Sequence, residues 1–330
     1  MIEPRRLAAR AAAERLAASL GEAVGQRVGF AVRGEQRRSA HTQLEVITDG
    51  LFLRRLQTDP SLDGVSCVLF DEFHERRRDS DLAFTLLREA APLLHPELAV
   101  MVMSATLDLT DLRQRLPEAV VLSSEGRAHP VETIHQAPRQ EEKLPRQVLR
   151  ALEHHALSLP RGSGVLVFLP GIAEIERCRE LLEQTSSLRH WQINPLHGQL
   201  PLNQQSAALQ RCPGSCDGSV VLASAIAESS ITIDGVQLVI DSGLSRQLRF
   251  DPNTGMEGLE TVPSSLASAD QRRGRAGRQG PGQCIRLWSP AEQHRRPGFS
   301  PPELQLADPQ PILMELAQWG AGLGDDLPWL

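Results

Sequence analysis

The chain contains almost no lysine. Of its 330 residues only Lys143 is a lysine, and it stands in the run Glu-Lys-Leu-Pro. A phosphate-binding P-loop needs the run Gly-Lys-Ser/Thr, in which the lysine reaches the β- and γ-phosphates of a nucleotide. Arginine is no simple replacement, because its planar fork binds with a different geometry. Because the single lysine does not stand in such a run, these residues contain no P-loop.

Long apolar runs are also missing, and so is any excess of positive charge. No segment is apolar over enough residues to cross a bilayer, and no signal peptide is recognisable. We therefore expect a cytoplasmic protein with no membrane partner. The formal net charge is −6, so nucleic-acid binding would depend on a local basic surface. Arginines do cluster, at positions 5–10, 76–78 and 272–278.

Cysteine is too sparse and too scattered for a metal centre. The close pair Cys212 and Cys216 has no second Cys/His pair at the spacing of a zinc site. In a cytoplasmic protein we expect reduced thiols. Apolar residues make up 41% and charged residues 23% of the chain, which is typical of a soluble globular protein, and its length predicts two domains.

One acidic stretch follows a short apolar run. The run Val65 to Phe70 comes after Gly64, is too short for a helix, and predicts a strand buried in a parallel sheet. Asp71 and Glu72 follow it directly. Ligands of open α/β sheets bind at the carboxyl ends of the strands, where one acid can hold Mg²⁺ and its neighbour can act on a water. A strand followed by a solvated acidic turn is the alternative.

A basic motif lies about two hundred residues later, at Gln271 to Arg278. It has four arginines and two glycines within eight residues. An exposed basic turn does not need the glycines, whereas a loop that brings guanidinium groups close to a phosphate does. The forked guanidinium binds two phosphate oxygens and stays charged, so this motif predicts phosphate recognition.

Other segments predict alternating helices and strands. A helix beginning near Pro4 and ending at Leu20-Gly21, a helix from Asp79 to Ala91, and a second buried strand at Leu98 to Met103 belong to the first half. Strands at 165–169, 220–224 and 236–240 predict a second parallel sheet. Pro252 to Gly255 is a strong turn signal, and 311–319 reads as an amphipathic helix.

Together these segments resemble the DEAH-box family of superfamily 2 helicases, and most closely its HrpB branch. The run Asp71-Glu72-Phe73-His74 resembles motif II, with Phe where most members have Ala. Ser104-Ala-Thr106 resembles motif III, which makes Ser104 and Thr106 coupling residues. The run Gln271 to Arg278 resembles motif VI, and the resemblance covers nearly the whole chain.

The resemblance implies an α/β fold with two RecA-like lobes, each built on a doubly wound parallel sheet. We expect an incomplete first lobe at 1–130, a linker at 131–145, a second lobe at 146–290, and the start of a helical winged-helix region at 291–330. The prolines and charges between Gly126 and Pro145 support the linker on their own.

The resemblance also implies ATP and Mg²⁺ as cofactors. Asp71 would hold Mg²⁺ together with Glu72, and Glu72 would act on the attacking water. Gln271 would position that water, while Arg275 and Arg278 would bind the γ-phosphate and stabilise its charge.

Nucleic-acid contacts are implied at Arg5, Arg6, Thr48 and Gly198. The run Ala223 to Gly235 resembles motif V, which adds contacts at Ser230 and Thr232 and places Asp234 near the nucleotide. The chain departs from the family pattern here, with Ser224 and Ala225 where Thr and Asn are usual. The expected partner is single-stranded nucleic acid, with RNA preferred to DNA.

The expected function is an ATP-dependent RNA or DNA helicase that couples hydrolysis to movement on nucleic acid. The missing P-loop leaves three explanations open. The chain is a fragment or a mis-started form of a helicase, a degenerate relative that binds nucleic acid without hydrolysis, or a protein-interaction module that keeps only the fold. In each case we expect little or no ATPase activity from these residues alone.

Overall fold

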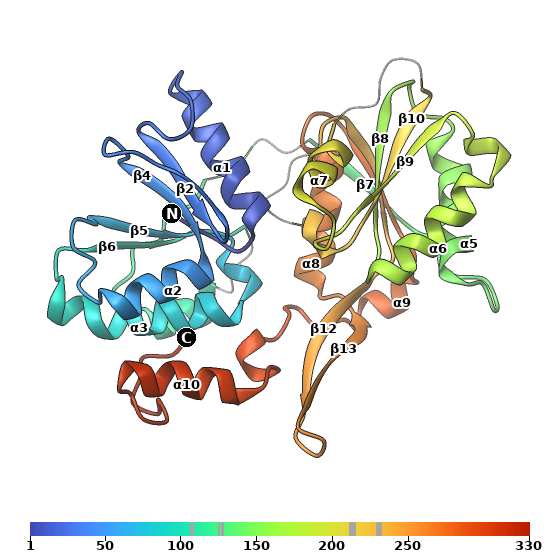
Figure 1. Ribbon diagram of the computed structural model, residues 1–330. Coiled ribbons are helices and arrows are strands. Elements are labelled where there is room, and N and C mark those ends of the chain that lie inside the picture. The colour runs from blue at the N-terminus through green and yellow to red at the C-terminus, as the bar shows by residue number, and fades with distance from the viewer. Residues whose placement is uncertain (106–108, 125, 127–128, 211–215, 229–232) are drawn as a thin grey trace. The chain divides into compact units, whose positions relative to one another are not determined.

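The computed structural model describes residues 1–105, 109–124, 126, 129–210, 216–228 and 233–330. They form two compact units, and each is described by itself. Unit one contains residues 1–122, 248–258 and 301–330, and unit two contains residues 123–247 and 259–300. Each unit has a six-stranded sheet whose strands are mostly parallel (Figure 1), which confirms the predicted fold class.

The sheet of unit one is parallel except at one edge, where β2 and β3 pair antiparallel. In spatial order its strands are β3 (Glu35–Arg37), β2 (Val28–Val32), β4 (Leu44–Thr48), β1 (Ile2–Glu3), β5 (Cys67–Phe70) and β6 (Ala99–Val102). Helix α1 (Arg6–Ser19) covers one face, and α2 (Asp49–Thr58) and α3 (Arg78–Leu94) cover the other (Figure 1). Helix α4 spans Leu109–Arg115.

The strand β6 was expected to be buried, and this expectation is wrong. It is an edge strand, and among the described residues no strand pairs with its outer side. Val100 is 40% exposed and Met101 is 44% exposed. Successive residues of a strand point to opposite faces, so apolar side chains are uncovered on both faces of this edge.

The C-terminal segment folds onto unit one. Helix α10 (Pro309–Trp319) buries Ile312 and Leu316 in the same core as Phe84 and Leu87 of α3. Backbone pairing joins the segment to the turn after motif II, because Glu303 N donates to Arg76 O at 2.9 Å. The segment 301–330 is therefore part of the first unit's core.

Unit two has an all-parallel sheet. In spatial order its strands are β7 (Val131–His135), β14 (Gly282–Arg286), β11 (Val236–Asp241), β8 (Ser163–Phe168), β10 (Gly218–Ala223) and β9 (Trp191–Leu196). Its helices are α5 (Leu144–Ala151), α6 (Ile172–Glu183), α7 (Leu202–Ala208), α8 (Leu266–Gly274) and α9 (Pro290–Gln293). Helices α5 and α6 pack on one face and α8 packs beside β11 and β7 (Figure 1).

The unit boundaries differ from the expected ones. The segment 131–145, expected as a linker, contains β7, which pairs with β14 in the second sheet. The hairpin strands β12 (Leu244–Asp251) and β13 (Met256–Pro263) are joined at the predicted turn Pro252–Gly255. The tip of this hairpin groups with unit one, since Phe250 N donates to Leu306 O at 2.8 Å.

Two further expectations concern compartment. No described helix is both long and apolar enough to cross a membrane. Cys67, Cys178 and Cys284 are free thiols, but Cys216 is disulfide-bonded, so the expectation of reduced thiols throughout is wrong for this residue. Burial raises the pKa of the Cys178 and Cys284 thiols to about 12.

Candidate functional site

The acids of motif II lie at the carboxyl end of β5, where the sequence placed them. Asp71 continues the strand's pairing, because its backbone N–H donates to Ile2 O at 3.0 Å. The Asp71 carboxylate then accepts a hydrogen bond from the Glu72 N–H at 2.8 Å. The first bond sets the point at which the chain leaves the sheet, and the second holds the Asp71 carboxylate against the Glu72 backbone.

The backbone is strained on both sides of the 3₁₀ turn Phe73–Glu75. Glu72 has a φ of +50° and Arg76 has a φ of +46°, a region that costs a non-glycine residue roughly 1–3 kcal/mol. The Phe73 N–H donates to Met103 O at 3.1 Å and thereby ties the turn to the end of β6. Strain of this kind persists at functional sites because the surroundings overdetermine it.

Motif III contacts motif II directly. Ser104 Oγ lies 3.2 Å from His74 Nδ1, and His74 Nε2 lies 3.6 Å from a Glu72 carboxylate oxygen. A chain of polar contacts therefore runs from the end of β6 to Glu72. Thr106, the other expected coupling residue, lies outside the described residues. The coupling role of both remains a prediction.

The sequence analysis missed Glu3, which lies beside Asp71. Its side chain is 3% exposed, and its Oε2 atom is buried with no hydrogen-bond partner. Burial, and next the neighbouring Asp71, raise the pKa of Glu3 to about 8. The signal was available, because Glu3 ends β1, the strand next to β5, and parallel strands end at one edge.

The donor set at this edge suits a hard divalent cation. Mg²⁺ prefers oxygen ligands and is usually held by one or two carboxylates together with phosphate oxygens and water. Among the described residues, no group of three or more Asp, Glu, His or Cys side chains forms a protein-only metal site. Asp71 fits the role of a single carboxylate ligand. The described residues hold no counterpart of the P-loop that would grip the phosphates.

The expected motif Ia arginines differ from each other. Arg5 lies just before α1 and forms two hydrogen bonds with Glu75, at 2.8 and 2.9 Å. Glu75 therefore offsets the charge of Arg5 within the protein, and the expected contact of Arg5 with nucleic acid stays a prediction. Arg6 is exposed at the start of the helix. Thr48 lies at the N-terminus of α2, without a side-chain capping bond.

The basic cluster 76–78 is not an open basic surface. Each arginine pairs with an acid of unit one, in the pairs Arg76–Asp81 at 3.1 Å, Arg77–Asp49 at 2.9 Å and Arg78–Asp79 at 3.1 Å. Asp49 and Asp81 are 5% and 3% exposed, and burial raises the pKa of both carboxyls. This cluster is therefore an internal ion-pair network next to motif II.

Motif VI contributes a buried anchor as well as candidate phosphate ligands. Arg272 is 1% exposed, and its guanidinium lies 2.9 Å from Asp241 and 3.2 Å from Glu228. Burial alone would lower the pKa of Arg272, but Asp241 and Glu228 outweigh it and raise this pKa. Arg275 is also buried, and its Nε donates to the Glu228 carbonyl oxygen at 2.9 Å. Gln271 is partly exposed and Arg278 is exposed.

The other expected residues of unit two lie at different strand ends, with Gly198 after the carboxyl end of β9 and Asp234 before the amino end of β11. Gly198 is exposed shortly after β9. Asp234 is exposed and accepts a hydrogen bond from Gln279 Nε2 at 2.8 Å, which links motif V to the end of motif VI. Ser230 and Thr232 lie outside the described residues.

Comparisons with known proteins agree with these motifs. Residues 147–280 match the family described as helicase conserved C-terminal domain. The ATP-dependent RNA helicase HrpB of Escherichia coli (strain K12) is 42% identical over the whole chain, which covers 40% of that protein. Two crystal structures, of E. coli DEAH/RHA helicase HrpB and E. coli DExH-box NTPase HrpB, match 99% and 100% of this chain with TM-scores of 0.89 and 0.85. Their identities are 41% and 42%, and the chain spans about 40% of their length.

Proposed function

We propose that the chain belongs to the HrpB-type DEAH-box helicases and forms the part of an ATP-dependent RNA helicase that acts on the γ-phosphate and touches the RNA backbone. The observation that carries the proposal is the position of Asp71 and Glu72. Both acids follow an inner strand of the sheet, and the turn after the αL residue Glu72 is tied to the end of β6. The 42% identity to the E. coli helicase HrpB over the whole chain supports the proposal.

In unit one, Glu72 is the residue that acts on the attacking water. Its carboxylate accepts a proton or orients the water, as the corresponding acid does in related phosphoryl-transfer sites. Asp71 is the candidate ligand of Mg²⁺, which would neutralise charge on the phosphate oxygens when bound. His74 and Ser104 would limit the rotation of Glu72 through the contacts described above.

In unit two, Gln271, Arg275 and Arg278 are the candidate γ-phosphate residues. An arginine that meets the transferred phosphate is worth about 10³–10⁵ in rate. The bond from Arg275 to the Glu228 carbonyl holds its side chain in one place. The guanidinium of Arg272 is fully occupied inside the unit, so we assign it no contact with substrate.

RNA is the proposed nucleic-acid partner, with backbone contacts at Arg6, Thr48 and Gly198. Arg5 is proposed to hold Glu75 and the turn beside motif II, in addition to any phosphate contact. Retention of both motif II acids and of the motif VI arginines does not favour a module that keeps only the fold. ATP remains the proposed nucleotide, although this chain has no lysine for a P-loop.

Phosphate release with and without single-stranded RNA tests the proposal. The chain alone should show little turnover, because nothing in it grips the triphosphate as a P-loop does. A fusion that places the P-loop-bearing segment of an HrpB helicase before Met1 should hydrolyse ATP. Glu72→Gln should abolish that activity, while Asp63→Asn, at an exposed acid, should leave it unchanged.

Two outcomes would count against the proposal in different ways. A folded fusion without turnover would overturn the hydrolytic function. Robust turnover by the chain alone, lost in Glu72→Gln, would keep the function and overturn the claim that the missing P-loop prevents it.

A further inference from the structure

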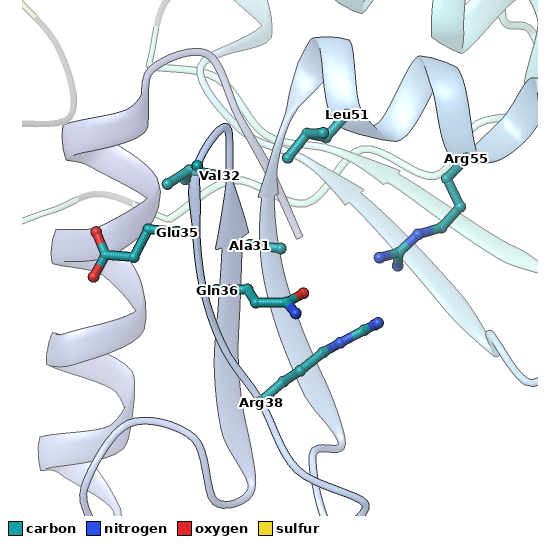
Figure 2. A pocket seen from close by; sticks show the side chains of 8 residues that line it. Ala31, Val32, Glu35, Gln36, Arg38, Leu51 and Arg55 are labelled. Atoms are coloured by element: carbon teal, nitrogen blue, oxygen red, sulfur yellow. The ribbon is translucent and has the colours of Figure 1, made fainter.

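A cavity of about 500 Å³ lies at the edge of the first sheet where β2 and β3 pair. Its floor and walls include Ala31 of β2, Gln36 of β3, Arg38 just after β3, and Leu51 and Arg55 of α2 (Figure 2). We call this cavity the hairpin pocket. It is far along the sheet from motif II, because β4 and β1 separate β2 from β5.

The strand register explains why the sheet is hollow here. Ala31 pairs with Gln36 across β2 and β3, so both side chains point to the same face. The Ala31 side chain is too small to fill that face, whereas the space beside Gly29, the preceding residue on it, is occupied by atoms of Arg37, Arg38 and Thr42. The larger Val28, Phe30 and Val32 are buried with α1 in the core on the other face. Helix α2 packs on β4 and β1, so the β2–β3 end stays open.

Two arginines converge at this hollow. Arg38 lies 3.4 Å and Arg55 lies 2.8 Å from the two carboxylate oxygens of Glu45, which is 18% exposed. The two guanidiniums are 50% and 37% exposed. One carboxylate against two guanidiniums leaves one net positive charge, and each guanidinium has five N–H donors, most of them not used by Glu45.

The remaining acid at the pocket is directed elsewhere. Figure 2 shows the Glu35 side chain pointing toward α1 and away from Arg38 and Arg55. It lies 3.7 Å from Arg10 of that helix and 3.7 Å from Arg37. An anion bound to Arg38 and Arg55 therefore does not face the Glu35 carboxylate, and the one carboxylate beside it, that of Glu45, is shared by the two guanidiniums.

We propose that the hairpin pocket binds one nucleotide unit, with its phosphate on the N–H groups of Arg38 and Arg55 that Glu45 does not use and its remaining part against Ala31 and Leu51. Guanidinium forks match phosphate oxygens, and a pocket of this volume suits a single small ligand. The Gln36 amide offers both a donor and an acceptor for a base or a sugar hydroxyl. Both arginines are partly exposed, so the binding is weak and salt-sensitive.

The place of the pocket on α2 connects it with the proposed RNA path. Leu51 and Arg55 are four residues apart and share one face of that helix, and Thr48 is the residue just before its first turn. From Thr48 to Arg55 the helix advances about 10 Å. An RNA strand that touches Thr48 can therefore continue into the pocket, and in this respect the inference rests on the proposed function. A free mononucleotide offers the same phosphate, sugar and base as one unit of an RNA strand, so it is the alternative ligand of the pocket.

Matched arginine variants test the pocket. Arg37 and Arg38 are adjacent and similarly exposed, 55% and 50%, but Arg37 pairs with Glu35 and Arg38 pairs with Glu45. Arg38→Gln and Arg55→Gln should each weaken binding of fluorescein-labelled decauridylate about threefold to tenfold and lower the salt slope by about one. Arg37→Gln should change the affinity less than twofold. Melting temperatures establish that all variants fold.

The second probe is adenosine monophosphate, titrated by calorimetry. Binding to the wild type and Arg37→Gln but not to Arg38→Gln would identify a free mononucleotide as the ligand. RNA binding that falls in Arg38→Gln and Arg55→Gln without any binding of the mononucleotide would identify the strand. Both results support the pocket.

Equal behaviour of Arg37→Gln and Arg38→Gln with both probes would overturn it, and so would binding of a hexaglutamate peptide where neither nucleotide probe responds. Thr48→Ala combined with Arg6→Gln separates this inference from the proposed function. If that variant binds RNA like the wild type while Arg38→Gln does not, the proposed backbone contacts fail and the pocket stands. If Arg38→Gln binds RNA like the wild type while the double variant does not, the pocket proposal is refuted and the proposed backbone contacts stand.

Discussion

Replacing Asp241 with Asn should destabilise unit two strongly, because it leaves Arg272 charged in a buried site. Asp241 is fully buried and Arg272 is 1% exposed, with 2.9 Å between their charged atoms. Removing one partner of such a pair costs about 3–5 kcal/mol, since the other charge stays desolvated. Asn keeps the size of Asp and an oxygen that can accept from the Gly243 N–H, which now bonds Asp241 at 2.8 Å. The change therefore isolates the charge.

The expected loss lies at the lower end of that range. Glu228 remains 3.2 Å from Arg272, and the guanidinium also lies 5.2 Å from the centre of the Phe168 ring. A loss of about 3 kcal/mol in a unit of this size lowers the melting temperature by about 6–12 °C. Differential scanning calorimetry should show the shift in the transition of unit two and leave that of unit one in place.

Asp217→Asn is the matched control. Asp217 lies 2.8 Å from Arg161, a distance as short as that of the buried pair, but the two side chains are 34% and 87% exposed. Exposed pairs contribute only about 0–1 kcal/mol, so its melting temperature should fall by no more than about 2 °C. Equal shifts in the two variants, or a shift below 2 °C in Asp241→Asn, would refute the claim that burial makes the motif VI pair indispensable.

Three other predictions follow from the structure. Between pH 4.5 and 8 the folded state keeps a proton on Glu3 that the unfolded state has released, because the pKa of Glu3 is raised in the folded protein. The wild type should therefore lose stability over this pH range relative to a Glu3→Gln variant. Urea melts at a series of pH values measure the difference. Endoproteinase Lys-C should cut folded protein once, after the exposed Lys143, and the two pieces should stay together on a sizing column because β7 remains paired with β14. In fluorescence anisotropy, Arg6→Gln should weaken binding of single-stranded RNA about twofold to fivefold at low salt and have little effect at high salt, whereas a salt-independent loss would contradict a phosphate contact.

Features that depend on a short stretch of chain could be predicted from the sequence. An apolar run followed by Asp71 and Glu72 defines the end of a strand and its acids, and both lie where this pattern placed them. The turn Pro252–Gly255 and the helix near 311–319 follow from local residue preferences in the same way. The residues that determine such a feature are all neighbours in the sequence, so contacts with distant parts of the chain do not change it.

Features that depend on distant partners could not be predicted. The run Arg76 to Arg78 looked like a basic surface, because nothing nearby in the sequence reveals that Asp49 pairs with Arg77 from 28 residues away. Glu303, which accepts from the Arg78 N–H at 3.0 Å, lies 225 residues from it. Glu3 was not singled out for a similar reason, because it becomes a neighbour of Asp71 only when β1 pairs with β5.

The open edge of β6 and the lack of a P-loop lysine are related through the geometry of parallel sheets. A parallel strand added to β6 would cover Val100 and Met101, which are now exposed. Its carboxyl end would lie at the same edge as Ser104 and Asp71, because parallel strands end together. A loop at that end can offer backbone N–H groups to a phosphate that also meets Asp71 and Glu72. An added strand would therefore complete both the core and the phosphate grip, so hydrolysis by the fusion should appear together with burial of β6.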